Sequence, residues 1–125
     1  LSFNAYRLTL DPKEWSVLDP YDRPVLVGEF HFGAPDRGVF DTGIVGVADQ
    51  AARGRAYQAY VRSVLALPKF VGAHWFQYVD QPTTGRADGE NGNVGFVSIT
   101  DTPYPELIAA AREINADIYR LRYAK

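Results

Sequence analysis

Three short apolar segments, each followed by a segment with helical signals, limit what this chain can fold into. The apolar segments span residues 1–6, 25–30 and 70–78, and the helical signals follow at 11–18, 47–67 and 102–121. Strands that alternate with helices pair in parallel and are joined by right-handed crossovers. Strand segments that are apolar on both faces are typical of a parallel sheet covered on both sides. The sequence therefore predicts an α/β fold made of three consecutive β/α units.

Helix starts and stops support this order. Asp11 followed by Pro12 and Glu14 is an N-cap, a proline in the first helical turn and a capping-box acid. Thr102 is the expected cap of the last helix, and Pro68 stops the middle one. The loop 33–46 is longer than the usual connection in α/β units, and 95–100 is expected to form a short hairpin-like piece. Long loops that follow strands are where we expect function.

The length of the chain predicts one unit, residues 1–125, that is incomplete as a sheet. Three units cannot close a barrel, so both outer strands would be edges with unpaired backbone groups. The chain also opens inside an apolar segment, Leu1-Ser2-Phe3. We therefore expect a segment of a longer protein, whose edges are covered by the rest of that protein or by a second copy of this chain.

Charge and composition exclude several classes of partner. The net charge of -2, with both signs scattered, gives no basic stripe for nucleic acid and no polybasic segment for a membrane surface. The apolar runs are far shorter than the roughly 20 residues that span a bilayer. No cysteine is present, and the acidic stretch 88–93 lacks the ligand spacing of a calcium loop. We expect no metal and no cofactor, and leave the compartment open, secretion included.

Polar and aromatic side chains gather where the predicted strands end. Glu29 follows Gly28 near the end of an apolar strand, and Tyr6, His31, Trp75 and Gln77 also lie at or just beyond strand ends. Each has a structural alternative: Glu29 could be a buried acid paired to an arginine, Trp75 core packing, and His31 a loop or core histidine. Arg7 and Arg37 are the candidate partners of Glu29.

Taken together, these side chains suit a sugar. Aromatic rings stack on the C–H faces of a pyranose, amides and imidazoles bond its hydroxyls, and a carboxylate can attack or stabilise the anomeric carbon. We expect Tyr6, Glu29, His31 and Trp75 to point to one common face at the carboxyl ends of three neighbouring strands. That edge is where (β/α)8 enzymes build their active sites.

At this point the sequence resembles a known family. The segments 2–6, 24–33, 74–78, 88–91 and 100–106 look like the last three β/α units of clan A retaining glycoside hydrolases, and are most similar to the family 50 β-agarases and their relatives. The resemblance implies a partial TIM (β/α)8 barrel, with 1–6, 25–30 and 71–77 as strands 6 to 8. It also implies an oligosaccharide or polysaccharide substrate of the β-linked galactan or agarose type.

The resemblance also implies roles for individual residues. The nucleophile of the clan falls on Glu29, and the tyrosine that orients it falls on Tyr6. The tryptophan that floors the sugar subsite falls on Trp75, and we expect the Trp75–Phe76 peptide bond to be strained or cis. Further expected substrate contacts are Asn4, His31, Gln77 and Glu90. The acid/base glutamate of the clan lies on the fourth strand and has no counterpart in this chain.

The resemblance implies double displacement with retention, and the isolated chain is expected to have little or no activity because half of the carboxylate pair is absent. Two alternatives stay open. One is another clan A specificity, such as a β-galactosidase. The other is an inactive, self-associating barrel fragment or a carbohydrate-binding piece.

Overall fold

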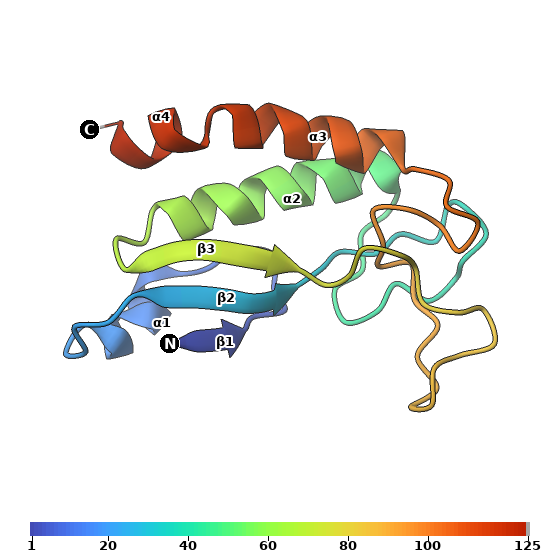
Figure 1. Cartoon of the computed structure of the whole chain (residues 1–125), viewed down its shortest axis with the longest axis horizontal. Helices are drawn as coiled ribbons and strands as arrows, with labels where there is room; N and C mark the ends of the chain where they lie inside the picture. The colour runs from blue at the N-terminus through green and yellow to red at the C-terminus, as the bar shows by residue number, and fades with distance from the viewer. Residues whose placement is uncertain (125) are drawn as a thin grey trace.

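The three predicted strands form one parallel sheet, in the order β1-β2-β3. The computed structural model describes residues 1–124. Along the chain its elements are β1 (Ser2–Asn4), α1 (Pro12–Trp15), the 3-10 turn η1 (Ser16–Leu18), β2 (Val25–Phe30), α2 (Gln50–Leu65), β3 (Phe70–Trp75), α3 (Pro105–Ala116) and α4 (Ile118–Tyr123). Figure 1 shows the three strands pointing the same way, with the long loops leaving their carboxyl ends. The predicted α/β fold with parallel strands is confirmed.

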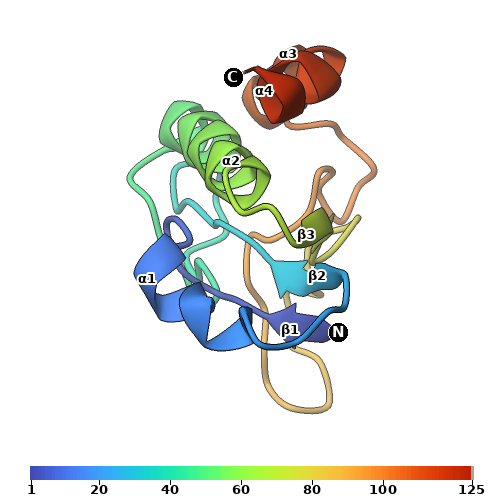
Figure 2. The same cartoon turned by 90° about the vertical axis from the view of Figure 1, so that its left-hand side faces the viewer.

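Both crossovers lie on the same side of the sheet. Helices α1 and α2 follow β1 and β2, and in the view along the strands they stand on one side while the other side carries no helix (Figure 2). The register pairs Asn4 with Glu29 and Val27 with Ala73, with irregularities next to Glu29 and after Val25. The strand ends that carry Tyr6, Glu29 and Trp75 are therefore neighbours at one edge of the sheet.

Aromatic residues make the core between the sheet and α2. Phe30 stacks on Tyr60 with ring centroids 4.2 Å apart and an interplanar angle of 6°. Trp75 meets Phe30 edge-on at 5.2 Å and Tyr57 at 5.6 Å. Tyr60 also donates its hydroxyl to the carbonyl oxygen of Ala5 over 2.7 Å, so this packing ties α2 to the end of β1. Aromatic contacts of this kind stabilise beyond the area they bury.

The two faces of the sheet differ, which corrects one expectation. Val25, Val27 and Phe70 are 0%, 0% and 4% exposed because they point toward the helices. The other face carries Leu26 beside Gly72, together with small and polar residues such as Ser2 and Gly28, whose positions adjoin each other. The expectation of strands that are apolar on both faces is therefore confirmed only in part. A strand with alternating orientation needs only one apolar row to bind its covering helix.

Aspartate side chains cap α1 and α2, but the starts of α2 and α3 differ from the predicted ones. Asp49 caps α2 by accepting from the Ala52 N–H over 2.6 Å, so the helix begins at Gln50 rather than at 47. Asp11 caps α1 as predicted. Thr102 does not cap α3, because the helix begins at Pro105 with Tyr104 in the cap position.

Two further expectations concern the C-terminal third. The hairpin-like piece expected at 95–100 is confirmed in part, because Val97 forms an antiparallel bridge with Pro103 and the Tyr104 N–H donates to the Phe96 carbonyl oxygen over 3.0 Å. The single predicted last helix divides at Asp117 into α3 and α4. Among residues 1–124, no helix is both long and apolar enough to cross a membrane.

Candidate functional site

Tyr6 and Glu29 meet at the carboxyl ends of β1 and β2. The Tyr6 hydroxyl donates to Glu29 Oε2 over 2.5 Å, and the Ala5 N–H donates to the Glu29 carbonyl oxygen over 3.0 Å. Burial raises the pKa of Tyr6, and the hydrogen bond to Glu29 and the charge of that carboxylate raise it further. The phenol therefore stays protonated at neutral pH and acts as a donor. This bond fixes one carboxylate oxygen of Glu29 and leaves Oε1 available.

The structural alternative for Glu29 is wrong. Arg7 forms its ion pair with Glu14, and Arg37 forms its ion pair with Glu106. Within residues 1–124, Glu29 takes part in no ion pair, and its side chain is part-buried beside Tyr6. Glu29 is therefore held by the Tyr6 phenol rather than by an arginine.

Asn4 lies on the open face of the sheet beside Gly28. A Cβ atom at Gly28 would come within 2.7 Å of Ser2 Oγ and 2.8 Å of Asn4 Oδ1. Only glycine leaves room for these two side chains next to the strand. The polar groups of Ser2 and Asn4 therefore form a floor one residue before Glu29.

His31 is placed close to the pair but serves the neighbouring loop. It is 3% exposed, and its ring lies 4.8 Å from that of Tyr6. Its Nε2 accepts from the Ile44 N–H over 2.9 Å, so the ring proton sits on Nδ1. Burial lowers the pKa of His31 to about 4, with the positive charge of Arg53 as the second cause. His31 is thus a neutral side chain that holds the loop 33–46 in place.

Trp75 does not share the face of Tyr6 and Glu29. Its ring packs among Phe30, Tyr57 and Phe96, and its Nε1 donates to the Val94 carbonyl oxygen over 2.8 Å. The predicted common face is therefore wrong for Trp75, because alternation along β3 turns its side chain toward α2.

Phe76, rather than Trp75, lies on the side of His31. Its ring lies 6.1 Å from that of His31, and the guanidinium of Arg86 lies 5.7 Å from its centroid. The cis peptide bond is Phe76–Gln77 rather than Trp75–Phe76, so that prediction is also wrong. The sequence alone predicts only that Trp75 and Phe76 point to opposite faces, and not which of the two faces α2.

The remaining predicted contacts lie in the loop that follows β3. Gln77 Nε2 donates to the Val79 carbonyl oxygen over 2.8 Å, so that amide is used within its own segment. Glu90 accepts from Gln81 Nε2 over 2.6 Å and pairs with Arg86 at 3.5 Å. A cavity of about 210 Å³ lies between this loop and the loop 33–46, lined by His31, Asp41, Gly43, Ile44, Gln81 and Glu90.

Sequence reasoning missed the buried polar residues behind this cavity. Arg53 is fully buried and donates to the carbonyl oxygens of Phe32 and Gly95 over 2.5 and 2.7 Å. Burial lowers the pKa of Arg53 to about 10, while the nearby Asp80 raises it. A signal was present: position 53 extends the buried stripe of α2 by one turn, where a charged residue needs a partner.

No group of three or more histidine, cysteine, aspartate or glutamate side chains in residues 1–124 is arranged to hold a metal ion. The chemistry that these residues offer is that of a carboxylate, a phenol and hydrogen-bonding amides. Such a set can attack or stabilise an electrophilic carbon and orient hydroxyl groups.

Known proteins similar to this chain are β-agarases. β-Agarase B of Vibrio sp. (strain JT0107) is 56% identical over 127 residues, covering 100% of this chain and 13% of the agarase. β-Agarase A of the same organism is 49% identical over 125 residues, covering 95% of this chain and 13% of that protein. A solved structure of an exo-β-agarase superposes with a TM-score of 0.96 at 52% identity, covering 100% of this chain and 17% of that one. No family model matches the chain.

These relatives are much longer than the chain. It spans 13% of the length of both Vibrio agarases and 17% of the exo-β-agarase structure. The chain is therefore agarase-like, homologous to a segment of these glycosidases, and its mixed α/β fold with a three-stranded parallel sheet recurs within them.

Proposed function

We propose that this chain is the C-terminal part of the (β/α)8 catalytic barrel of a retaining glycoside hydrolase, with Glu29 as its nucleophile. The substrate proposed is an agarose-type polysaccharide or another β-linked galactan. The observation that carries the proposal is the 2.5 Å hydrogen bond from Tyr6 to Glu29 at the carboxyl edge of the sheet. That edge is where (β/α)8 enzymes hold their catalytic residues.

The barrel is supported by the topology of the described residues. Three parallel strands in sequential order, with α1 and α2 as crossovers on one side, are the arrangement of an arc of such a barrel. Both β1 and β3 are edge strands here, and edges of this kind need a partner. The rest of the barrel is the partner we propose, and the small, polar open face would then line its interior beside the site.

In the proposed first step, Glu29 Oε1 attacks the anomeric carbon while Tyr6 holds Oε2. The bond from that carbon to the leaving oxygen breaks, and the leaving oxygen takes a proton from an acid that lies outside this chain. In the second step that group removes a proton from water, the water attacks the anomeric carbon, and the bond to Glu29 breaks. Tyr6 stabilises the carboxylate when it leaves, because it donates to a charged oxygen.

Other described residues would shape the sugar site. Asn4 lies on the open face beside Gly28, the residue before Glu29. The Phe76 ring lies beside His31. An aromatic ring and an amide are the groups that bind the C–H face and the hydroxyls of a pyranose. Glu90 would contribute a hydrogen-bond acceptor held in place by Gln81 and Arg86.

The proposal is tested by chemical rescue in the protein that carries this segment with the rest of its barrel. Glu29→Ala removes the nucleophile, and hydrolysis of an agaro-oligosaccharide should fall by about 10⁴-fold or more. Added azide should then attack the anomeric carbon in the space left by the side chain. The expected product is a glycosyl azide whose anomeric configuration is inverted, measured by NMR.

A matched control is Glu113→Ala, which removes an exposed carboxylate on α3. Its hydrolysis rate should match that of the unmodified protein. Full activity of Glu29→Ala, or rescue that gives a product of retained configuration, would contradict the assignment of Glu29. Binding of agarose with no hydrolysis by the unmodified protein would favour the carbohydrate-binding alternative.

A further inference from the structure

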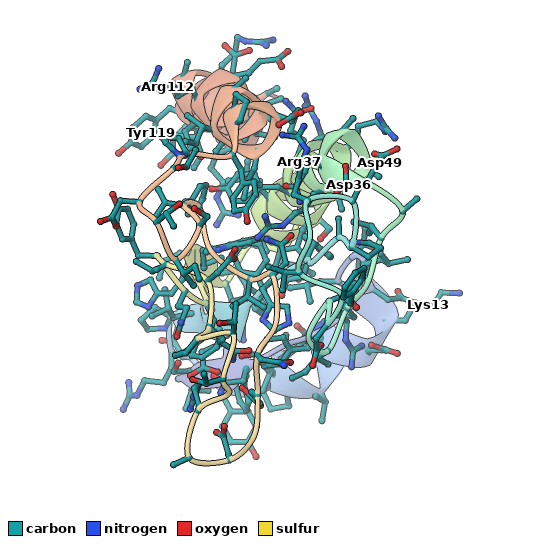
Figure 3. All side chains as sticks on the ribbon, turned by 90° about the vertical axis from the view of Figure 1, so that its right-hand side faces the viewer. Lys13, Asp36, Arg37, Asp49, Arg112 and Tyr119 are labelled. Carbon is teal, nitrogen blue, oxygen red and sulfur yellow. The ribbon has the colours of Figure 1, made fainter. Side chains whose placement is uncertain are left out.

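Behind the candidate site lies a cluster of buried polar side chains that the proposed reaction does not use. It comprises Gln50, Arg53, Asp80, Asn93 and Tyr104, each 5% exposed or less. Buried polar groups destabilise a fold unless they are hydrogen-bonded, so a cluster of five has a demanding geometry. Figure 3 looks onto this end of the molecule, where Asp36 and Asp49 lie close together at the start of α2.

Asn93 is the member that joins the others. Its Nδ2 donates to both carboxylate oxygens of Asp80, over 3.1 and 3.0 Å. Its Oδ1 accepts from the Ala34 N–H over 3.2 Å and from Gln50 Nε2 over 2.8 Å. Its backbone N–H donates to the Asp41 carbonyl oxygen over 2.8 Å. The side-chain amide of Asn93 therefore accepts from two N–H donors through its oxygen and donates to a carboxylate through its nitrogen. Only the amide group of an asparagine or glutamine can do both.

Apart from Gln50 at the start of α2, the partners of Asn93 belong to the two loops that line the cavity. Ala34 and Asp41 come from the loop after β2, whose residue Ile44 is bonded to His31. Asp80 comes from the loop after β3. These are separate segments, and the sheet alone does not fix one against the other.

The link continues to the wall of the cavity through the residues beside Asn93. The Gly92 N–H donates to Gln81 Oε1 over 2.7 Å, and Gln81 Nε2 donates to Glu90. Asp80 also accepts from Tyr104 over 2.5 Å and from the Gly95 N–H over 2.7 Å, which ties the loop to the start of α3. Displacing Asn93 would thus move Glu90 relative to His31.

We propose that Asn93 is a positioning residue, which holds the loops after β2 and β3 in one arrangement so that the cavity lined by His31 and Glu90 keeps its shape for a sugar. This inference rests on the proposed function for its substrate, and on the hydrogen bonds alone for the coupling of the loops. Asn93 does not touch the reacting atoms, and its effect is on the binding and alignment of the substrate.

The test is Asn93→Asp, which replaces the donor that faces Asp80 by a carboxylate. Two carboxylates in contact cannot both stay ionised, so the pair takes up a proton as the pH falls and the bond to Asp80 is restored. The other ionisable groups packed around this position are Arg53, Tyr104 and Asp36. At pH 8 we expect kcat/KM to fall by about 10²-fold, mostly through KM, and the deficit to shrink toward pH 5.

The rescue variant is the exchange Asp80→Asn with Asn93→Asp, which returns one carboxylate and one amide to the contact. It should recover most of the kcat/KM lost in either single variant at pH 8. The control is Ala109→Asp on the exposed face of α3, which adds the same charge away from the site and should leave kcat/KM unchanged.

Hydrogen exchange separates this proposal from the proposed function. Asn93→Asp should raise exchange in both 33–46 and 80–93 at pH 8, and the exchanged pair should lower it again, whatever the substrate is. Faster exchange in one loop only, or a pH-independent loss of activity that the exchanged pair fails to rescue, would overturn the proposal. If Glu29 proved not to be the nucleophile, the exchange expected for the Asn93 variants would be unchanged.

Discussion

The two faces of the sheet are built from the same three strands but differ in their packing and polar contacts. On the face under α2, Phe30, Tyr60 and Trp75 pack ring against ring, and the strand positions beneath them are buried. On the open face, Tyr6 and Glu29 hold a hydrogen-bonded pair among small and polar residues. The difference teaches that a single strand can supply both, because neighbouring residues such as Glu29 and Phe30 point to opposite faces.

The largest effect on activity is expected for Glu29→Gln on the open face. The amide keeps the shape of the side chain and can still accept from Tyr6, but it cannot form the covalent intermediate. We expect the hydrolysis rate to fall by about 10⁴-fold or more, while the free energy of unfolding changes by less than about 1 kcal/mol. Rate measurements and urea unfolding on the same preparation check both parts. A loss of stability as large as that of a core variant would mean that Glu29 supports the fold rather than the reaction.

Phe30→Ala is the matched change on the covered face, one residue away. It removes a ring that stacks on Tyr60 and contacts Trp75, so the free energy of unfolding should fall by about 3 to 5 kcal/mol. Urea unfolding measures this directly. If the variant kept full stability, the ring cluster under α2 would not be the core of this unit.

Tyr6→Phe tests the open face more finely. It removes the donor to Glu29 and keeps the ring against His31. A hydrogen bond to a charged group contributes about 1.5 to 3 kcal/mol, so kcat should fall by about 10- to 100-fold. The free energy of unfolding is the second readout and should change by less than about 1 kcal/mol. An unchanged kcat would mean that Tyr6 does not act on Glu29.

The smallest expected effect concerns His31, which lies between the two regions. Its folded pKa of about 4 is below the unfolded value of 6.5, so the unfolded chain binds more protons between these values. The free energy of unfolding should therefore fall as the pH drops from about 6.5 to about 4, and be insensitive to this group above about 7. His31→Gln, whose Oε1 can accept from Ile44, should remove that part of the pH dependence. A flat profile in the unmodified protein would contradict a neutral, buried His31.

Much of this architecture could be predicted because it depends on local patterns. The bounds of β2 agree with the apolar run that ends at Phe30, and Asp11 caps its helix because cap chemistry involves only the next few residues. Thr102 failed as a cap because Tyr104 and Pro105 set the entry to α3 within a loop held by Asp80. The division of the last helix at Asp117 likewise has no clear signal in the apolar spacing.

Which side of a strand a residue faces was harder to predict. Trp75 and Phe76 are adjacent aromatic residues in an apolar run, and the sequence assigned the site to the first of them. Packing of the Trp75 indole against Tyr57 and Phe96 reverses this assignment. The period of two along a strand fixes that neighbours differ, but not which one faces the helix.

The sequence by itself determined the order of the β/α units, the parallel sheet and the gathering of Tyr6, Glu29 and His31 at one edge. These follow from apolar periodicity and from helix caps, which act between residues close in the chain. Only the tertiary structure decided that Trp75 belongs to the core and that Asn93 joins two loops. Such contacts link residues up to 59 positions apart, as from Ala34 to Asn93, and a one-dimensional pattern carries no distance between them.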